Sequence, residues 1–255
     1  MSSTKFLDNS RPVFVSIIIS TFNDAEPLRR TLNSLTAGGV ISSEILIIDG
    51  GSIDGTDHVI SEFSHIVSHY ISEPDCGIYD AWNKGLYLSK GSYIAFLGAG
   101  DYYIDDGLQR LIDFSLANKD ADLILSNINL VQKERFVRQL GSDWSWKIFR
   151  RYMNIAHVGA FHSRRLFNRY GMFDASYRIA GDYEFLLRSR DSLKTAYLDR
   201  VTVQMEAGGV SQTNPLVFIE AECAKIKHKA VPPLLARLDT YLSRIKSRIK
   251  RILFF

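Results

Sequence analysis

The stretch VFVSIII at residues 13–19 decides the fold class, because it is a short apolar run rich in β-branched residues. Such a run is typical of a strand that is buried on both faces of a sheet. A polar turn follows at residues 21–24 (TFND), and Leu28, Leu32 and Leu35 then recur at helical spacing. The sequence therefore predicts a strand, a turn and a helix in that order.

The same unit occurs again further along the chain. Residues 44–48 (EILII) predict a strand, residues 49–55 (DGGSIDG) a glycine-rich turn and residues 56–63 a helix. Three more elements follow, namely a strand at 66–71, a helix at 77–88 and a strand at 93–97. This alternation predicts an α/β fold with a mostly parallel central sheet that is flanked by helices.

The second half of the chain is more mixed, and we expect it to complete the same domain. Strands are predicted at 123–125, 131–138, 195–198 and 201–205, and helices at 108–116, 144–151, 164–170, 182–188 and 220–228. We expect an N-terminal arm at 1–12, one α/β domain at 13–230 and a basic amphipathic C-terminal helix at 231–255.

The composition excludes several classes of protein. A chain of 255 residues can form one large domain, and its 46% hydrophobic content is ordinary for a globular protein. A net charge of +3 does not favour nucleic acid as a partner. Two cysteines provide neither a disulfide framework nor zinc-ligand spacing. Without a signal peptide or a run of about 18 apolar residues, the expected location is cytoplasmic.

Three polar turns are expected at one edge of the predicted sheet. In open parallel sheets, ligands bind beyond the carboxyl ends of the strands. The turns at 21–24, 49–55 and 98–101 each follow a predicted strand. We therefore expect the ligand site at this edge.

Asp101 is the first candidate for a metal ligand. It follows a buried strand directly, and Gly98 and Gly100 allow a bulky ligand to approach the backbone closely. Nucleoside diphosphates bind through a cation with oxygen ligands. An aspartate that only forms a turn before a helix beginning at Asp105 is an equally good interpretation of this spacing.

The glycine-rich turn at 49–55 is a candidate for nucleotide contact. Its carboxylates can accept hydrogen bonds from a ribose or a base. It contains neither the GxGxxG pattern of dinucleotide-binding folds nor a phosphate-binding P-loop. The alternative is that Ser52 or Asp54 caps the helix that follows.

Asp182 is the candidate general base. It begins a predicted helix, whose dipole favours the ionised carboxylate that a base requires. A simple helix N-cap is the alternative. The lone His157 is more typical of a structural residue. The absence of HExxH and GxSxG patterns argues against zinc hydrolases and α/β-hydrolases.

The segment 234–255 combines apolar residues at helical spacing with a cluster of basic residues. The basic residues are Arg237, Arg244, Lys246, Arg248, Lys250 and Arg251. A basic amphipathic helix is typical of a membrane-surface element. The alternative is a helix that packs its apolar stripe on the domain.

Together these segments resemble family 2 glycosyltransferases, which have the GT-A fold. The motifs are VSIIISTFN (15–23), EILIIDGGSIDGT (44–56), EPDCGIYDAWNKG (73–85), FLGAGD (96–101), HVGAFHSRRLF (157–167), GMFDASYRIAGDYEFLLR (171–188) and GGVS (208–211). The third motif resembles the branch that builds bacterial capsule, O-antigen and exopolysaccharide.

The resemblance implies roles for individual residues. The implied donor-binding residues are Thr21, Asn23, Asp49, Gly51, Asp80, Asn83, Lys84, Gly100 and Asp101. Asp101 would hold Mg²⁺ or Mn²⁺, and Asp182 would be the catalytic base. His157 and Glu184 would lie near the acceptor.

Two residues depart from the pattern of many relatives. Gly100 stands where a second acid often precedes the metal ligand. Asp101 is therefore expected to be the single carboxylate on the cation, which the donor diphosphate would also bind. Gly50 stands where many relatives carry a second Asp that contacts the nucleobase. The resemblance therefore identifies uracil less directly than it identifies the family.

The predicted activity is inverting transfer of a sugar from a nucleotide-diphosphate sugar, with UDP-sugar favoured. The expected acceptor is a saccharide or a polyprenyl-linked saccharide of bacterial surface polysaccharide, at the cytoplasmic face of the inner membrane if residues 234–255 contact it. A nucleotidyltransferase and a non-catalytic nucleotide-sugar-binding protein are the alternatives.

Overall fold

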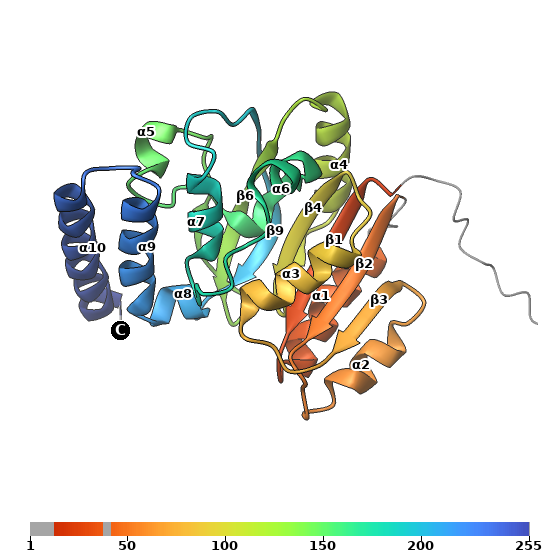
Figure 1. The fold of residues 1–255 in the computed structure, drawn as a ribbon. Coiled ribbons are helices and arrows are strands. Elements are labelled where there is room, and N and C mark those ends of the chain that lie inside the picture. The colour runs from red at the N-terminus through yellow and green to blue at the C-terminus, as the bar shows by residue number, and fades with distance from the viewer. Residues whose placement is uncertain (1–12, 38–41, 255) are drawn as a thin grey trace, which may run out of the picture.

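The computed structural model describes residues 13–37 and 42–254, with side chains described up to residue 248. The expected arm at 1–12 lies outside these residues. A nine-stranded sheet with the order β3-β2-β1-β4-β8-β6-β9-β5, and with β7 paired to β6, forms the centre of the molecule (Figure 1). The strands are β1 Val15–Thr21, β2 Ser43–Asp49, β3 Val67–Ser72, β4 Tyr93–Gly98, β5 Tyr102–Tyr103, β6 Leu123–Gln132, β7 Arg135–Leu140, β8 Ala160–Ser163 and β9 Thr195–Glu206.

Helices cover both faces of this sheet, as the alternating pattern predicts. They are α1 Ala25–Ala37, α2 Thr56–Glu62, α3 Ile78–Leu88, α4 Gly107–Ala117, α5 Trp146–Phe149, α6 Arg164–Tyr170, α7 Gly181–Leu187, α8 Val210–Thr213, α9 Leu216–Lys227 and α10 Pro233–Phe254, with a 3₁₀ turn, η1, at His157–Gly159. The predicted α/β fold class is confirmed.

The strand at the start of the chain is buried on both faces. Ile17 and Ile19 pack with Leu28 and Leu32 of α1. Ile18 points to the opposite face, where it joins the cluster that contains Trp82 of α3. The apolar run predicted this double burial, because a parallel strand under two helical layers has no polar face.

Strands β3, β2, β1 and β4 are parallel neighbours, which brings their carboxyl ends to one edge. Thr21 pairs with Asp49, and Ser20 pairs with Gly98. The turns that follow β1, β2 and β4 therefore meet at this edge, as the sequence predicts.

The second half adds antiparallel pairs. β8 runs antiparallel to both β4 and β6, whereas β9 runs parallel to β6. The single strand predicted at 131–138 is wrong, because β6 and β7 form a hairpin there. Lys133 and Glu134 at its tip have φ values of 49° and 66°. Consecutive positive φ angles are typical of a type I′ turn, and no glycine or asparagine marks it.

The bounds of three other predicted elements also differ from those in the structure. The two strands predicted at 195–198 and 201–205 form one strand, β9, whose pairing shifts register opposite Ser126 and Asn127. The helix predicted at 144–151 is the shorter α5. The helix predicted at 220–228 begins earlier, at Leu216.

Candidate active site

Backbone hydrogen bonds fasten the turns at the carboxyl edge to one another. The amide of Gly50 donates to the Thr21 carbonyl at 3.0 Å, and the amide of Ala99 donates to the Ser20 carbonyl at 3.1 Å. The amide of Glu73 donates to the Asp49 carbonyl at 3.1 Å. The loops that follow four strands thus form one connected rim.

Asn23 and Asp49 hold the shape of this rim. Asn23 has a φ of 53°, and its backbone N–H donates to Ser52 Oγ at 2.7 Å. The Asp49 side chain is buried and accepts hydrogen bonds from Ser52 and from Ser72. Thr21 Oγ1 is buried and has no hydrogen-bond partner among the described residues.

Within the turn at 49–55, the side chain of Asp54 binds the first residue of the next helix, because its Oδ1 accepts from the Thr56 amide at 3.2 Å and from the Thr56 hydroxyl at 2.6 Å. The N-cap of α2 is Gly55, rather than Ser52 or Asp54. The other carboxylate oxygen of Asp54, Oδ2, accepts a hydrogen bond from the amide of Ala25 at the start of α1, at 3.0 Å. Gly51 has a φ of 87°, which favours glycine at this position.

Gly50 leaves room for a different carboxylate. A Cβ atom at residue 50 would lie 2.9 Å from Asp75 Oδ2 and 3.1 Å from the Phe22 ring. Asp75 therefore occupies the space that a side chain at residue 50 would need. No local pattern predicts this contact, because it depends on how the loop after β3 folds over the turn after β2.

Asp80, Asn83 and Lys84 of α3 organise neighbouring loops. Asn83 bonds to both backbone groups of Phe173, at 2.9 Å and 3.0 Å. Lys84 pairs with Glu73 at 2.8 Å and with Asp80 at 3.7 Å. Within the described chain these three side chains already bind protein groups.

Asp101 lies between the ends of β4 and β9. Its Oδ2 accepts from the Gly98 amide and its Oδ1 accepts from the Glu206 amide, each at 3.3 Å. Its carboxylate does not cap α4, which begins at Gly107. Burial, with a smaller contribution from the Glu206 carboxylate, raises the pKa of Asp101 to about 7.

Thr31 of α1 fixes the backbone on both sides of that carboxylate. Its hydroxyl donates to the Asp101 carbonyl at 2.8 Å and accepts from the Gly100 amide at 3.0 Å. Gly100 has a φ of 100°, so the turn needs glycine here.

Glu206, at the end of β9, is a second carboxylate beside Asp101, and sequence reasoning missed it. Its Oε1 accepts from the Lys133 amide at 2.9 Å, whereas its Oε2 is buried without a hydrogen-bond partner in the described structure. A buried, unpartnered carboxylate oxygen next to a second carboxylate is suited to a hard divalent cation. Asp101 and Glu206 therefore fit a Mg²⁺ or Mn²⁺ ion.

Asp182 lies in the first turn of α7, one residue after its start, and Ala180 is the N-cap. Its Oδ1 accepts from the Tyr79 hydroxyl at 3.1 Å and from the Tyr183 amide at 2.8 Å. Burial raises the pKa of Asp182 to about 6. A Cβ atom on Gly181 would lie 2.7 Å from the Tyr79 ring, so glycine allows this close packing.

An aromatic chain connects Asp182 with the end of β1. Tyr79 meets Trp82 edge-on at 5.3 Å, and Trp82 Nε1 donates to Ser20 Oγ at 3.3 Å. His157 stacks on Trp82 with ring centroids 5.0 Å apart. Burial lowers the pKa of His157 to about 3, so this imidazole is neutral and supports the wall of the site.

Glu184 does not join Asp182. Its buried carboxylate binds Arg188, Lys227 at 3.0 Å and His228 at 2.6 Å. Two residues along a helix place side chains on nearly opposite faces. The structure therefore assigns Glu184 to an ion cluster that ties α7 to α9.

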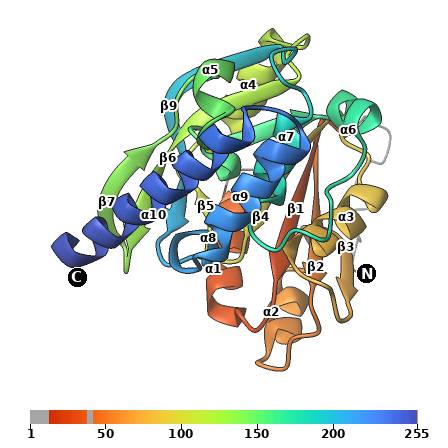
Figure 2. The ribbon, with the colours of Figure 1, turned by 60° about the vertical axis from the view of Figure 1, so that its left-hand side comes forward.

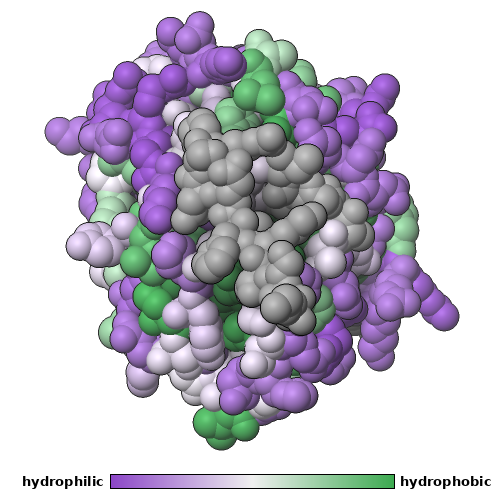
Figure 3. Space-filling view, turned by 90° about the vertical axis from the view of Figure 1, so that its right-hand side faces the viewer, coloured by the Kyte–Doolittle hydropathy of each residue, from purple (hydrophilic) through white to green (hydrophobic). Residues whose placement is uncertain are grey.

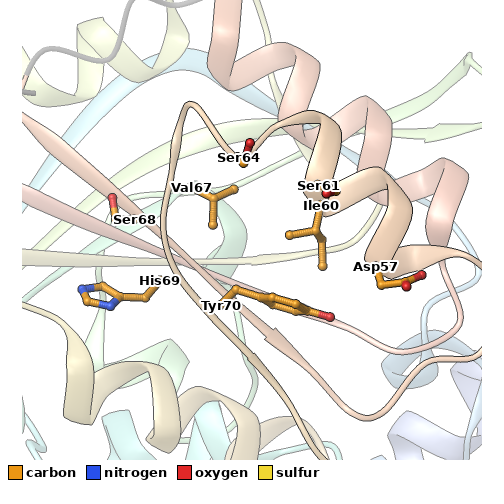
Figure 4. A pocket seen from close by; sticks show the side chains of 8 residues that line it. All are labelled: Asp57, Ile60, Ser61, Ser64, Val67, Ser68, His69 and Tyr70. Carbon is orange, nitrogen blue, oxygen red and sulfur yellow. The ribbon is translucent and has the colours of Figure 1, made fainter. Parts of the chain in front are cut away.

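Two surface hollows lie away from these residues. One, of about 290 Å³, lies between α2 and the edge strand β3, where Tyr70 reaches toward Asp57 while His69 lies on the other side (Figure 4). The other is lined by residues of the β6–β7 hairpin. Figure 3 views the β3 end of the molecule, where hydrophilic side chains cover much of the surface in view.

Comparisons with known proteins identify the family of this chain. The family model described as Glycosyl transferase family 2 matches residues 16–176. A "PGL/p-HBAD biosynthesis glycosyltransferase" of Mycobacterium bovis is 33% identical over 211 residues, which cover 79% of this chain and 80% of the relative.

Solved structures share the fold at low sequence identity. TarS of S. aureus in complex with UDP-GlcNAc aligns with a TM-score of 0.69 and 15% identity, over 89% of this chain and 70% of TarS 1–349. A mannosyltransferase of Pyrobaculum calidifontis with GDP-Man and Mn²⁺ aligns with a TM-score of 0.61 and 16% identity, over 89% and 69%. The chain spans 39% of the longer TarS structure.

These findings confirm the predicted enzyme class over a nucleotidyltransferase or a non-catalytic binding protein. The matched family model covers more than half of the chain, and the similar curated relatives are named glycosyltransferases. The chain is therefore a glycosyltransferase that belongs to glycosyl transferase family 2.

Proposed function

We propose that this enzyme transfers a sugar from a nucleoside-diphosphate sugar with inversion at the anomeric carbon. The observation that carries the proposal is Asp182, a carboxylate with a raised pKa that Tyr79 connects to the carboxyl edge of the sheet. A carboxylate of this kind can take a proton from an acceptor hydroxyl. One direct displacement inverts the configuration, and it needs no nucleophile from the enzyme.

Asp101 and Glu206 are the proposed ligands of a divalent cation. When bound, that cation would neutralise the charge that develops on the leaving diphosphate. The Asp101 carboxylate is held by the backbone amides of Gly98 and Glu206, and the Glu206 carboxylate by the Lys133 amide. The mannosyltransferase neighbour with GDP-Man and Mn²⁺ supports a cation in this fold.

We infer a uridine diphosphate donor, with Asp75 contacting the base. Asp75 fills the space above Gly50, beside the exposed ring of Phe22. A carboxylate there can accept the imide N–H of uracil. The TarS complex with UDP-GlcNAc supports this donor class, whereas the GDP-Man complex of the other neighbour supports a guanine base in the same fold.

The proposed acceptor is a saccharide or a polyprenyl-linked saccharide of a surface polysaccharide, and the proposed location is the cytoplasm with contact to the inner membrane. In the described residues, none of the helices has the length and apolar character needed to cross a bilayer. The mycobacterial relative is named a "PGL/p-HBAD biosynthesis glycosyltransferase", and its role in biosynthesis supports an acceptor of a biosynthetic pathway.

The proposal is tested by incubating the enzyme with UDP-, GDP- and dTDP-sugars in the presence of Mg²⁺ or Mn²⁺. We expect release of free nucleoside diphosphate with a UDP-sugar, which is stimulated by an acceptor saccharide. A product with retained anomeric configuration would contradict the mechanism. Faster release from GDP-sugars would leave the mechanism intact and contradict the donor assignment.

We expect Asp75→Ala to weaken donor binding and to reduce base selectivity. Loss of one charge-assisted hydrogen bond costs about 1.5–3 kcal/mol, which corresponds to roughly a 10- to 150-fold increase in the Kd for UDP. Calorimetric titration of UDP and GDP measures both effects. Asp57→Asn, in the hollow beside α2, is the matched control and should bind UDP normally.

A further inference from the structure

The C-terminal helix α10 presents its apolar residues to solvent. Leu234, Leu238, Tyr241 and Leu242 are 80%, 48%, 64% and 37% exposed. Their spacing of i, i+4, i+7 and i+8 places them on one face of the helix. These four residues do not pack on the domain, whereas Leu235 and Ile245 of the same helix are half-buried.

The opposite face of α10 attaches the helix to the rest of the protein. Ala236, Asp239 and Thr240 are buried against α9 and its surroundings, and α10 lies alongside α9 (Figure 2). The Asp239 carboxylate accepts from Arg151 Nε at 3.2 Å, and Lys225 Nζ lies 3.6 Å away. Buried ion pairs of this kind fix the rotation of the helix about its axis.

The exposed charges of α10 are uniformly positive. Arg237, Arg244, Lys246 and Arg248 are exposed, whereas its one acid, Asp239, is buried and paired. Arg237, Arg244 and Arg248 follow at i, i+7 and i+11, so they form one row along the edge of the apolar stripe.

We propose that this face of α10 binds the surface of an anionic lipid bilayer. The apolar stripe would enter the interface between headgroups and acyl chains, while the flanking arginines would contact phosphate groups. A second copy of the chain fits less well, because pairing two stripes would bring like-charged arginine rows to one interface. The binding does not depend on the donor or on the mechanism.

Co-sedimentation of the full chain with vesicles tests this surface. We expect binding to phosphatidylcholine vesicles that contain phosphatidylglycerol, little binding to phosphatidylcholine alone, and weaker binding as salt increases. The variant Leu238→Glu/Tyr241→Glu should lower the bound fraction, and Arg244→Glu/Arg248→Glu should weaken partitioning roughly tenfold or more.

Leu116→Glu is the matched control, because Leu116 is a comparably exposed leucine (44%) on α4. It should bind vesicles as the unmodified chain does. Equal binding by the α10 variants would overturn the proposal. A dimer seen by light scattering that Leu238→Glu/Tyr241→Glu disrupts, without any vesicle binding, would overturn it in favour of self-association. Release of nucleoside diphosphate, measured in parallel, separates this outcome from failure of the proposed function.

A second, independent feature lies behind Asp182. The buried carboxylate of Glu220 on α9 accepts hydrogen bonds from three consecutive backbone amides, those of Arg178, Ile179 and Ala180, each at 2.8 Å. Those amides belong to the segment that leads into α7. The family model ends at residue 176, so this contact lies beyond it.

We infer that Glu220 is a positioning residue that orients Asp182. Three bonds to adjacent amides fix the direction in which α7 begins, and Tyr79 holds the same segment through the Ile179 carbonyl at 2.7 Å. Burial raises the pKa of Asp182, and the negative charge of Glu220 adds to this increase, while the Tyr79 hydroxyl acts in the opposite direction.

We expect Glu220→Gln to lower kcat by about 10- to 100-fold with little change in the KM for the donor, because a misplaced base reacts slowly while the donor site is intact. The acid limb of the kcat profile should also move to lower pH, because the charge that raises the pKa of Asp182 is removed. Glu222→Gln, on the same helix, is the control.

A merely structural role would not move the acid limb. An unshifted limb together with unchanged kcat would overturn the assignment. If Glu220→Gln fails to fold, Glu220→Asp retains the charge and shortens the reach, and it should lower kcat while leaving the acid limb in place.

Discussion

The variant Asp182→Asn is expected to lose about 10²- to 10⁴-fold in kcat while the enzyme still binds its donor. General base catalysis contributes roughly 10²–10⁴-fold, and an amide cannot accept the proton of the attacking hydroxyl. The side chain is nearly isosteric, and the amide oxygen can still accept from Tyr79 and from the Tyr183 amide. The initial rate of transfer at saturating donor measures the loss.

The pH profile provides a second measurement on the same residue. Asp182 must be ionised to act, and its pKa is raised to about 6. Below this pH the carboxylate is protonated, so kcat should fall about tenfold per pH unit, and it should level off above pH 7. The residual activity of Asp182→Asn should lack this limb.

Asp191→Asn is the matched control, because Asp191 is an exposed acid shortly after α7. It should retain normal kcat and the same acid limb. Normal turnover by Asp182→Asn, with unchanged thermal unfolding, would rule out Asp182 as the base and would direct attention to another acceptor of the proton.

The parallel half of the fold could be predicted from the sequence because the patterns that indicate it are local. Each β-branched run ends in a polar turn, and parallel strands share one carboxyl edge, so Asp49 and Asp101 were expected there. The β6–β7 hairpin could not be predicted, because Lys133 and Glu134 adopt positive φ angles although neither residue type favours them.

The parts of the site that sequence reasoning missed all depend on long-range pairing. Glu206 reaches Asp101 because β9 pairs with β5, the two-residue strand that directly follows Asp101, and this pairing joins distant parts of the chain. Asp75 fills the space at Gly50 through a loop contact. Glu184 is a different case, because the resemblance implied a position near the acceptor, whereas its side chain joins the ion cluster with Arg188, Lys227 and His228.

Glu206 also changes what is expected of the metal. The sequence alone predicts that Asp101 holds the cation as the single carboxylate. The buried and unpartnered Oε2 of Glu206 predicts two carboxylate ligands instead. Two carboxylates should give measurable affinity for Mn²⁺ without donor, whereas one carboxylate would bind Mn²⁺ only together with the diphosphate.

We therefore expect Asp101→Asn to abolish Mn²⁺-dependent binding of UDP and to lower transfer by about 10³-fold or more, and Glu206→Gln to weaken Mn²⁺ binding by about 10- to 100-fold. Electron paramagnetic resonance of Mn²⁺, with and without UDP, measures the affinity independently of turnover. Asp105→Asn, an exposed acid near the same turn, is the control. If Glu206→Gln bound Mn²⁺ as tightly as the unmodified enzyme, Asp101 would be the only carboxylate on the cation, and Glu206 would serve only to hold the β6–β7 turn through Lys133.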